Sequence, residues 1–427
     1  MSKNRFILKG IIRDKRRSLL PVIVVAIGVM FVVFLDGFIG GMLGNMTKMT
    51  AIHDTGHLKV MTSAYNLEKD QIPAEYALLG TDDLITVLKE EYPSIDWTPR
   101  IIFGGLLDIP DQNGETKAQG PVRGTAYDLL SPQSKEAERI GLHKAIVDGG
   151  LIIQSGEILI SDDFSKSYDV HPGDEVTFFG STMYGSMSFM NYKVAGVVKF
   201  GIAVIDKGSI ILDIEDARLL MDMENAANEI LGFLPGDKYD REEAERIKQD
   251  FNSKYSDKSD EFSPIMLQLA DQNMMSQTLS YVDSLTLFLM FLVILALSIV
   301  LWNTGLLSGI RRYNEFGIRI ALGENKVAIY RSLLTESFMI GIIGSVLGTC
   351  IALLICLYLN KYGIDYGSIV ENMNLMVDPV IRADIKPSMF WIGFIPGVIS
   401  MLIGTALSGR AIFKRNTASL FNGDGGK

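Results

Sequence analysis

The sequence predicts an α+β membrane protein: four transmembrane helices, with a large mixed α/β extracytoplasmic domain inserted between helices 1 and 2. Three observations predict this fold class. The chain of 427 residues has a mean hydropathy of +0.23 and is only 21% charged, which is unusual for a soluble protein. Its apolar residues gather in four stretches, each near the ~20 residues that cross a bilayer. A long polar region, large enough for a compact domain, separates the first stretch from the second.

The positive charges predict the orientation of these helices. The apolar stretches run from 19 to 35, 285 to 307, 333 to 359 and 389 to 408. Lys and Arg residues crowd the segment before the first stretch, the loop after the second and the tail after the fourth. Because such residues favour the cytoplasmic side, both termini are expected inside and the polar region outside. The first stretch has no small-x-small cleavage site after it, so we expect a retained helix.

Each part of the chain then follows in order. We predict a cytoplasmic N-terminal segment (1–18), transmembrane helix 1 and a stalk (19–49), an extracytoplasmic domain (50–264), a second stalk and transmembrane helix 2 (265–310), a charged cytoplasmic helix (311–325), transmembrane helix 3 (326–360), a short external loop (361–387), transmembrane helix 4 (388–410) and a cytoplasmic tail (411–427). Leu267, Met274 and Tyr281 recur every seven residues, which is typical of paired helices. They therefore predict the second stalk helix.

The extracytoplasmic region shows the alternation of strands. Residues 57–61, 156–161, 192–198 and 208–212 predict strands, and residues 214–221 predict a helix. His53 and His57 are four residues apart, but Gly56 disfavours a continuous helix there and no further ligand has a suitable spacing. We therefore predict no metal site.

The segment from Arg311 to Gly323 predicts a short amphipathic helix between two apolar ones. Tyr313, Phe316, Gly317 and Ile320 fall on one side of it, whereas Arg312, Glu315 and Arg319 fall on the other. Glu315 lies four residues from both Arg311 and Arg319, a spacing that allows ion pairs on a helix. Gly323 is expected to end this helix and Asn325 to cap the next.

Small residues on the third apolar stretch predict close helix packing in the bilayer. They are Gly341, Gly344, Ser345 and Gly348; positions 341 and 345 are four residues apart, as are 344 and 348. We expect this packing face to lie between two subunits. Cys350 and Cys356 lie on different faces of the same helix and cannot bridge each other there.

The charged segment resembles the cytoplasmic loop of the FtsX/MacB/lipoprotein-releasing (LolC/LolE-like) superfamily of ABC transporter permeases. That loop contains Arg, Glu-hydrophobic-Gly-Ile and Leu-Gly, matched here by Arg311, Glu315, Phe316, Gly317, Ile318, Leu322 and Gly323. The outer region is similar to the MacB-like periplasmic domain of the same superfamily. The matching residues are Glu157, Gly173, Asp174, Gly196, Val197, Asp216, Ala217 and Leu220.

The resemblance implies a coupling helix that docks on a separate ABC ATPase, expected in two copies. The coupling residues would be Arg311, Arg312, Glu315, Phe316, Gly317, Arg319, Leu322 and Gly323. The chain carries no phosphate-binding Gly-x-x-x-x-Gly-Lys-Ser/Thr motif. We therefore expect a permease subunit that is not itself an enzyme and binds no cofactor directly, with ATP and Mg²⁺ bound by the partner. A second permease chain, identical or paralogous, and a bacterial inner-membrane location are also implied.

Within this superfamily, the sequence most resembles the lipoprotein-releasing permeases. Their first helix ends in Asn/Asp-Gly-Phe, matched by Asp36, Gly37 and Phe38, and their next strand is similar to residues 55–60. The resemblance implies ATP-driven extraction of lipid-anchored or amphipathic cargo from the outer leaflet, with a periplasmic carrier and membrane lipid as further partners. Flexible methionines suit irregular apolar cargo. The candidate contact residues are Met42, Met46, Met49, Met183, Met187 and Met274.

Other interpretations remain open at this point. The stalk methionines could simply pack the stalk, and the Met- and aromatic-rich segment 178–190 could be a buried hairpin. A MacB-type macrolide or peptide exporter is the near alternative within transport. An FtsX-like transducer that activates cell-wall hydrolases is a second class, although its outer domain is smaller, and an ATP-independent sensor or scaffold is a third. The net charge of −10 argues against nucleic acid as a partner.

Overall fold

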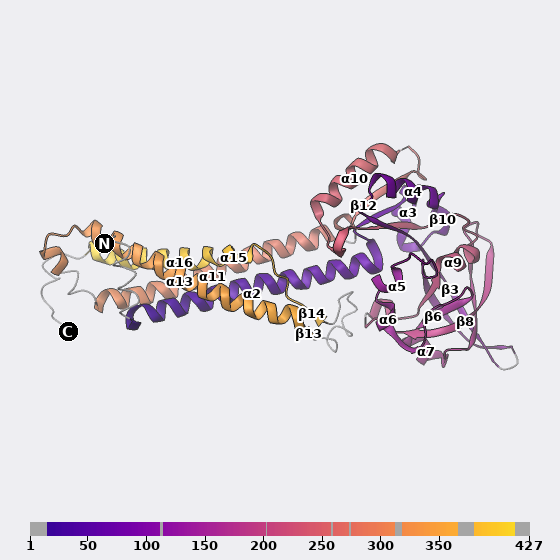
Figure 1. Cartoon of the computed structure of the whole chain (residues 1–427), viewed down its shortest axis with the longest axis horizontal. Coiled ribbons are helices and arrows are strands. Elements are labelled where there is room, and N and C mark those ends of the chain that lie inside the picture. Colours follow the sequence, from indigo (N-terminus) through magenta and orange to yellow (C-terminus); the bar gives the residue numbers. More distant parts are fainter. Residues whose placement is uncertain are drawn as a thin grey trace. The chain divides into compact units, whose positions relative to one another are not determined.

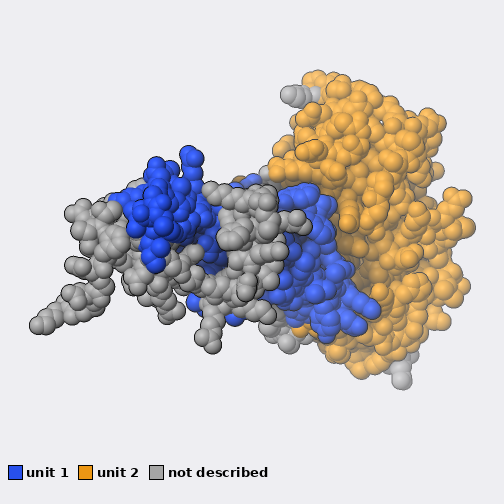
Figure 2. Space-filling view, turned by 60° about the vertical axis from the view of Figure 1, so that its left-hand side comes forward, with its two compact units in different colours: residues 1–43, 279–364, 381–427 blue, residues 44–278, 365–380 orange. Residues whose placement is uncertain are grey.

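The computed structural model describes residues 15–111, 114–201, 203–257, 259–272, 275–311, 318–365 and 380–414. The chain divides into two compact units, coloured separately in Figure 2. The first, here called the membrane unit, comprises Met1–Leu43, Leu279–Ile364 and Ile381–Lys427. The second, here called the head, comprises Gly44–Thr278 and Asp365–Val380. Each unit is described by itself below.

Four helices are long and apolar enough to cross a membrane, among the residues that the structure describes. They are α2 (Lys15–Thr50), α11 (Met275–Arg311), α13 (Lys326–Tyr362) and α16 (Phe394–Lys414), with the short α15 (Met389–Ile392) before the last (Figure 1). The predicted four transmembrane helices are therefore confirmed.

The small residues of α13 allow α2 and α16 to approach it closely. A Cβ atom on Gly348 would lie 2.4 Å from the carbonyl oxygen of Ala26, and one on Gly344 would lie 2.7 Å from a methyl group of Val25. Gly341 faces Val398 of α16. Ser345 is fully buried, and a Cβ atom on Gly397 would collide with its hydroxyl. The small-residue face of α13 is thus covered by helices of the same chain.

An extended segment crosses the outer end of the membrane unit. Residues 382–386, here called the strap, lie against a row of glycines on α2. The Asp384 N–H donates to the Gly37 carbonyl at 2.9 Å, and a Cβ atom on Gly41 would lie 1.9 Å from the Arg382 carbonyl oxygen. The Asn360 side chain of α13 donates to the Ala383 carbonyl at 2.8 Å. The strap thereby joins α2 to α13.

Helix α11 packs less closely than the other three. Its buried side chains include Leu297 and Leu301, which lie against Gly28 of α2 and Gly404 of α16. Its exposed large apolar side chains are Tyr281, Leu285, Leu287, Phe288, Phe291, Leu292, Leu295, Ile299, Val300 and Trp302. These side chains are available to contact lipid or another apolar surface.

The head is built on a ten-stranded sheet with the order β12-β1-β11-β3-β4-β9-β6-β8-β5, in which β7 joins β3 to β8. The strands are β1 (Leu58–Thr62), β3 (Asp96–Pro110), β4 (Thr116–Tyr127), β5 (Ile146–Gly149), β6 (Glu157–Ser161), β7 (Glu175–Ser181), β8 (Met187–Val198), β9 (Ser209–Asp213), β11 (Glu229–Phe233) and β12 (Pro264–Gln268). The pairings β3-β4-β9-β6-β8-β7 return to β3. They therefore form a closed ring.

Helices and short elements cover this sheet. They are η1 (Ala51–Thr55), α3 (Ser63–Glu68), η2 (Lys69–Gln71), η3 (Ala74–Tyr76), β2 (Leu78–Leu79), α4 (Thr81–Glu91), α5 (Glu136–Arg139), α6 (Leu142–Ala145), α7 (Asp162–Tyr168), α8 (Ala203–Asp206), α9 (Ile214–Met221), β10 (Ala226–Ala227), η4 (Pro235–Asp237), α10 (Arg241–Tyr255) and η5 (Leu269–Asp271). Two further short strands, β13 (Ile364–Asp365) and β14 (Val380–Ile381), lie in the segment predicted as the short external loop.

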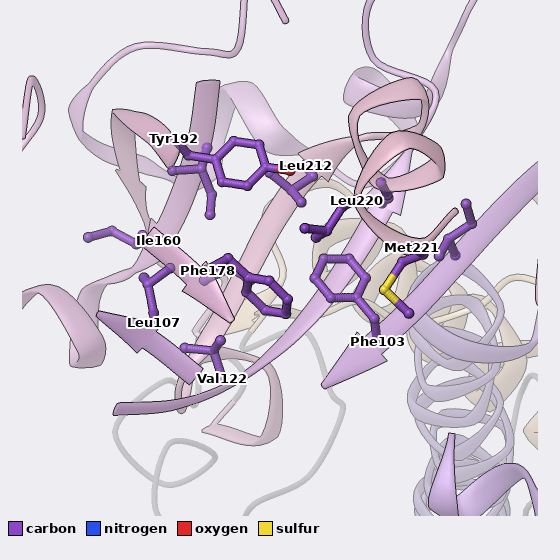
Figure 3. Packing of buried hydrophobic residues seen from close by; sticks show 14 of the residues in the cluster. Phe103, Leu107, Val122, Ile160, Phe178, Tyr192, Leu212, Leu220 and Met221 are labelled. Atoms are coloured by element: carbon purple, nitrogen blue, oxygen red, sulfur yellow. The ribbon is translucent and has the colours of Figure 1, made fainter. Parts of the chain in front are cut away.

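The ring of strands encloses the main apolar core of the head (Figure 3). The Phe103 and Phe178 rings meet edge to face, with centroids 5.2 Å apart, a favourable aromatic geometry. A Cβ atom on Gly124 would lie 2.1 Å from the Phe103 ring. This close approach explains a glycine in the middle of β4. A second core, with Leu58, Trp97 and Phe251, lies between β1, β11 and β12 and the helices α4 and α10.

Most of the predicted elements of the head are confirmed. The strands expected at 57–61, 156–161, 192–198 and 208–212 correspond to β1, β6, the second half of β8, and β9. The helix expected at 214–221 is α9, with Asp213 as its cap: the carboxylate accepts from the Glu215 N–H at 3.0 Å. These segments could be predicted because they are short apolar runs, buried on both faces: in β6, Ile158 and Ile160 lie in the main core and Leu159 in a smaller cluster.

The prediction that the second stalk helix starts at residue 265 is wrong. Residues Pro264–Gln268 form β12, which pairs antiparallel with β1, so Leu267 lies in the sheet opposite Lys59. The helix begins at Met275. Met274 lies outside the described residues. Leu267 lies in a strand and Tyr281 in a helix. Their spacing by multiples of seven residues therefore does not place them on one face of a helix.

His57 is a buried histidine with a structural role. Its side chain is almost fully buried, and its Nδ1 accepts a hydrogen bond from the Leu234 N–H at 2.9 Å. Burial lowers the pKa of His57 from 6.5 to about 4, although the nearby Asp237 carboxylate opposes the shift. Among the described residues no group of three or more potential metal ligands comes together.

His57 should make the stability of the head depend on pH. Because its pKa is lower in the folded state, the unfolded chain binds more protons below pH 6.5. Roughly 3 kcal/mol of unfolding free energy should therefore be lost as the pH falls from about 6.5 to about 4. His57→Asn, which keeps an acceptor but cannot titrate, should lose less over this range. Denaturant unfolding of the full-length protein, followed by Trp97 fluorescence with Trp302 and Trp391 replaced by Phe, would measure the difference. His143→Asn, at an exposed histidine, is the control and should behave as wild type.

Candidate functional site

The candidate coupling loop lies between α11 and α13. Helix α11 ends at Arg311, and residues 312–317, with Arg312, Glu315, Phe316 and Gly317, lie outside the described residues. The chain is helical again from 318 to 321 and turns at Gly323, whose φ of +92° suits glycine. Asn325 caps α13: its side-chain oxygen accepts from the Val327 N–H at 3.1 Å. The predicted helix stop and cap are therefore present.

Arg319 has a partner that sequence reasoning missed. Its guanidinium contacts both carboxylate oxygens of Glu324, at 2.6 Å and 3.0 Å, while Glu315, the partner that the sequence predicts, lies outside the described residues. The backbone supports the same turn, because the Glu324 N–H donates to the Arg319 carbonyl at 3.0 Å. The two residues are five apart, a spacing that becomes close only because the chain reverses at Gly323. The ion pair fixes the turn before α13.

The described part of the loop exposes apolar side chains. Leu322 is 82% exposed and Ile318 is also exposed. Apolar side chains at a helix end, beside a charged residue, can anchor a helix in a groove of a partner protein. The arrangement offers a docking surface and no catalytic chemistry. It is the part of the predicted coupling site that the structure describes.

The stalk methionines differ in their surroundings. Met42 is exposed on α2, whereas Met46 and Met49 are half-buried. Met49 packs against a small apolar cluster of the head that includes Ile52 and Ile152. Packing of the stalk therefore accounts for Met49, and Met42 is the most accessible of the three.

The hairpin β7–β8 separates the two other methionines. Met183 is only 9% exposed, and its N–H donates to the carbonyl of Met221 at 2.8 Å. Met183 therefore packs in the head core with little of its side chain exposed, and its contact with cargo stays a prediction. Met187, four residues further, is 83% exposed. The hairpin is thus packed at Met183 and exposed at Met187.

An exposed apolar row extends from Met187 across neighbouring strands. Leu106 of β3 pairs with Phe179 of β7, and Phe179 pairs with Phe189 of β8. The Phe179 and Phe189 ring centroids are 6.2 Å apart, while Phe189 is 71% and Leu106 45% exposed. We call Leu106, Phe179, Met187 and Phe189 the apolar row. Sequence reasoning missed Leu106, because a single leucine in a strand carries no sign of its exposure.

A hollow of about 620 Å³ adjoins the turn of this hairpin. Its lining includes Phe103, Met183, Tyr184 and Met221, with Glu68 at the end of α3 and Glu75 in η3. Tyr184 is exposed at its rim. The hairpin therefore exposes Tyr184 at its turn in addition to the apolar row.

Comparison with known families accounts for both units. A family described as MacB-like periplasmic core domain matches residues 18–282, more than half of the chain. A second family, FtsX-like permease C-terminal, matches residues 287–417. The chain belongs to the FtsX/MacB superfamily of ABC transporter permeases.

Comparison with solved structures gives a match to a periplasmic region. The crystal structure of the periplasmic region of MacB from Actinobacillus actinomycetemcomitans is 13% identical, covers 54% of this chain and 97% of its own, and superposes with a TM-score of 0.35. No curated protein sequence matches the permease.

Family membership establishes the general role of the permease. It is a multi-pass membrane protein with a periplasmic domain between its first and second helices. FtsX-family permeases pair with an ABC ATPase, and they lack ATPase activity themselves. ATP hydrolysis therefore belongs to the partner subunit.

Proposed function

We propose that the permease uses ATP hydrolysis by its partner ATPase to extract lipoproteins from the outer leaflet of the inner membrane. The observation that carries the proposal is the apolar row on the head, where Leu106, Met187 and Phe189 are exposed to solvent. Exposed apolar surface of this kind typically marks an interaction site. An acyl chain or the apolar surface of a periplasmic carrier would fit it. The resemblance at residues 36–38 to lipoprotein-releasing permeases supports the same cargo.

The ATPase would dock on the coupling loop, and we expect two ATPase copies and a second permease chain, identical or paralogous. The loop residues that contact the ATPase would be Arg311, Arg312, Glu315, Phe316, Gly317, Arg319, Leu322 and Gly323. ATP-driven closure of the ATPases would move this loop and, through the transmembrane helices and stalks, the head. Helix α2 continues without interruption from its apolar stretch to Thr50, which suits the transmission of movement. Cargo need not cross the bilayer in this mechanism.

Depletion of the permease in its own host tests the proposal. Lipoproteins should accumulate in the inner membrane, as measured by fractionation of the two membranes. If fractionation is unchanged while cells become sensitive to macrolides or peptides, export is the function, as the match to a MacB-like domain would suggest. If cells instead form chains, the permease is a signal transducer. Either result would reject lipoprotein release.

The apolar row gives a more local prediction. Met187→Ser together with Phe189→Ser should reduce release about tenfold or more, because two apolar contacts of roughly 1 kcal/mol each would be lost. Release from spheroplasts into purified carrier would measure it. Leu219→Ser, at an equally exposed leucine of α9, is the control and should release normally. Normal release by the double variant, at wild-type abundance, would exclude the row as a contact surface.

A further inference from the structure

The end of α2 enters the head through an irregular turn. After Thr50 the chain forms a π-helix, η1, and leaves it at Gly56, whose N–H donates to the Ala51 carbonyl at 2.8 Å. Carbonyl groups at such a helix end need partners from elsewhere in the protein. π-Helical turns are uncommon and are frequent at functional positions.

One of these carbonyls is held by a fully buried arginine. The Arg100 guanidinium of β3 donates from Nη2 to the Ile52 carbonyl oxygen at 2.8 Å. Arg100 is 0% exposed, and the ring of Tyr127 lies 4.8 Å from its guanidinium carbon. A positive charge at the C-terminal end of a helix is favourable. Arg100 therefore anchors the last turns of the stalk to the central sheet.

The charge of Arg100 is only partly matched by this contact. Glu136 of α5 is the nearby carboxylate, and its Oε2 lies 4.0 Å from Nη2 of Arg100. Within the described chain, Arg100 Nε and Nη1 donate to no acceptor, and Glu136 Oε2 accepts from no donor. A buried charge with unmade hydrogen bonds is costly. The two groups therefore have unused capacity to bind each other.

Glu136 is fixed in place independently of Arg100. Its other oxygen, Oε1, accepts a hydrogen bond from Arg139, which also contacts Asp96 on β3. The Arg139 guanidinium lies over the Phe233 ring, 4.0 Å from its centroid. Glu136 is thus held in place as a second partner for Arg100, beside the Ile52 carbonyl.

We propose that Arg100 passes movement of the stalk to the head by exchanging these two partners. In the arrangement described here Arg100 holds Ile52. When the end of α2 is pulled away, the guanidinium shortens its 4.0 Å ion pair with Glu136 Oε2 and donates a hydrogen bond to that oxygen. The exchange avoids leaving a buried arginine without a partner, so both arrangements are accessible. The inference rests on the mechanical coupling in the proposed function, but not on the identity of the cargo.

Strand β3 gives the exchange a route to the contact surface. The same strand carries Arg100 and, six residues further, Leu106 of the apolar row, a span of about 20 Å along a strand. Because Arg100 and Leu106 share one strand, a shift at Arg100 would pass to the row along the backbone of β3, through Gly104 and Gly105. A second buried ion pair, Lys59 with Glu229 at 2.8 Å, also contacts Asp54 of η1 at 3.7 Å and holds the neighbouring strands β1 and β11. The turn is thus tied to the sheet at two points.

The test uses the full permease with its ATPase, reconstituted in lipid nanodiscs, with Cys350 and Cys356 replaced. Spin labels at the exposed residues Lys48, near the end of α2, and Lys135, beside α5, report the distance between stalk end and head. The wild type should show two distances whose populations change between the nucleotide-free and ATP-bound states. Arg100→Met should abolish the nucleotide dependence while ATP hydrolysis continues, and should lower cargo release about tenfold or more.

Glu136→Gln provides the second variant, since it keeps the shape of the side chain and removes the charge that Arg100 would bind. It should retain the distance of the nucleotide-free state in the presence of ATP. It also decides the question if Arg100→Met does not fold, as judged by thermal unfolding. Nucleotide-dependent distances in either folded variant equal to those of the wild type would overturn the inference, as would a single fixed distance in the wild type. Wild-type movement combined with normal lipoprotein fractionation after depletion would instead reject only the proposed cargo.

Discussion

Leu322→Asp is expected to detach the permease from its ATPase. Leu322 is exposed in the described part of the coupling loop, so the substitution should leave folding unchanged. A charged side chain in a docking groove removes an apolar anchor and buries an unpaired carboxylate, a loss of roughly 2 kcal/mol or more. We therefore expect at least about a 30-fold weaker affinity. Co-purification and titration of the purified ATPase would measure it, and ATP-driven release should fall to background.

The control for this prediction is Leu219→Asp, which places the same change at an exposed leucine of the head. It should bind the ATPase as wild type. Glu315→Lys tests the part of the motif outside the described residues and should weaken binding similarly. Undiminished ATPase binding by both loop variants would show that the ATPase docks elsewhere.

Gly41→Ala should be far more damaging than its size suggests. Its new Cβ atom would lie 1.9 Å from the Arg382 carbonyl oxygen, and this oxygen belongs to the backbone of the strap and cannot rotate away. Either α2 or the strap must move, which would cost about 3 kcal/mol. We expect a strong loss of folded permease from the membrane, measured as abundance and as the midpoint of thermal unfolding in detergent.

Gly44→Ala is the matched control, three residues along the same helix. A Cβ atom there meets no atom within 4 Å, and alanine is favoured over glycine in a helix by roughly 0.5–1 kcal/mol. Gly44→Ala should therefore be neutral or slightly stabilising. If the two variants lose stability equally, flexibility of α2 rather than close contact with the strap explains these glycines.

The sequence predicted the two units well because each follows from a local pattern. Four apolar stretches predict four membrane helices whatever their packing. Short apolar runs likewise predicted strands such as β6 and β9, whose side chains are buried on both faces. The start of the second stalk was wrong for the same reason. Apolar residues of β12 continue into α11 with a chance spacing of seven, and only pairing with β1, two hundred residues away in sequence, distinguishes strand from helix.

The candidate sites were predictable only where a motif marks them. The coupling loop has such a motif, but the Arg319 to Glu324 ion pair depends on the turn at Gly323. Met183 and Met187 look equivalent in sequence, although the turn between them buries one and exposes the other. No sequence pattern marks Arg100, because its two contacts, the Ile52 carbonyl at the end of the stalk and the Glu136 carboxylate, are distant in sequence.

The unequal packing of the membrane helices has a consequence for the bilayer around them. The strap joins α2 to α13. Helix α11 contacts the other helices through Leu297 and Leu301, which lie against Gly28 and Gly404, and many of its apolar side chains are exposed. A helix with few neighbours changes its tilt most readily when its apolar length and the hydrocarbon thickness differ. A change in hydrocarbon thickness should therefore alter the tilt of α11 before that of the other three helices. The activity of the permease should then depend on the lipid composition of the membrane.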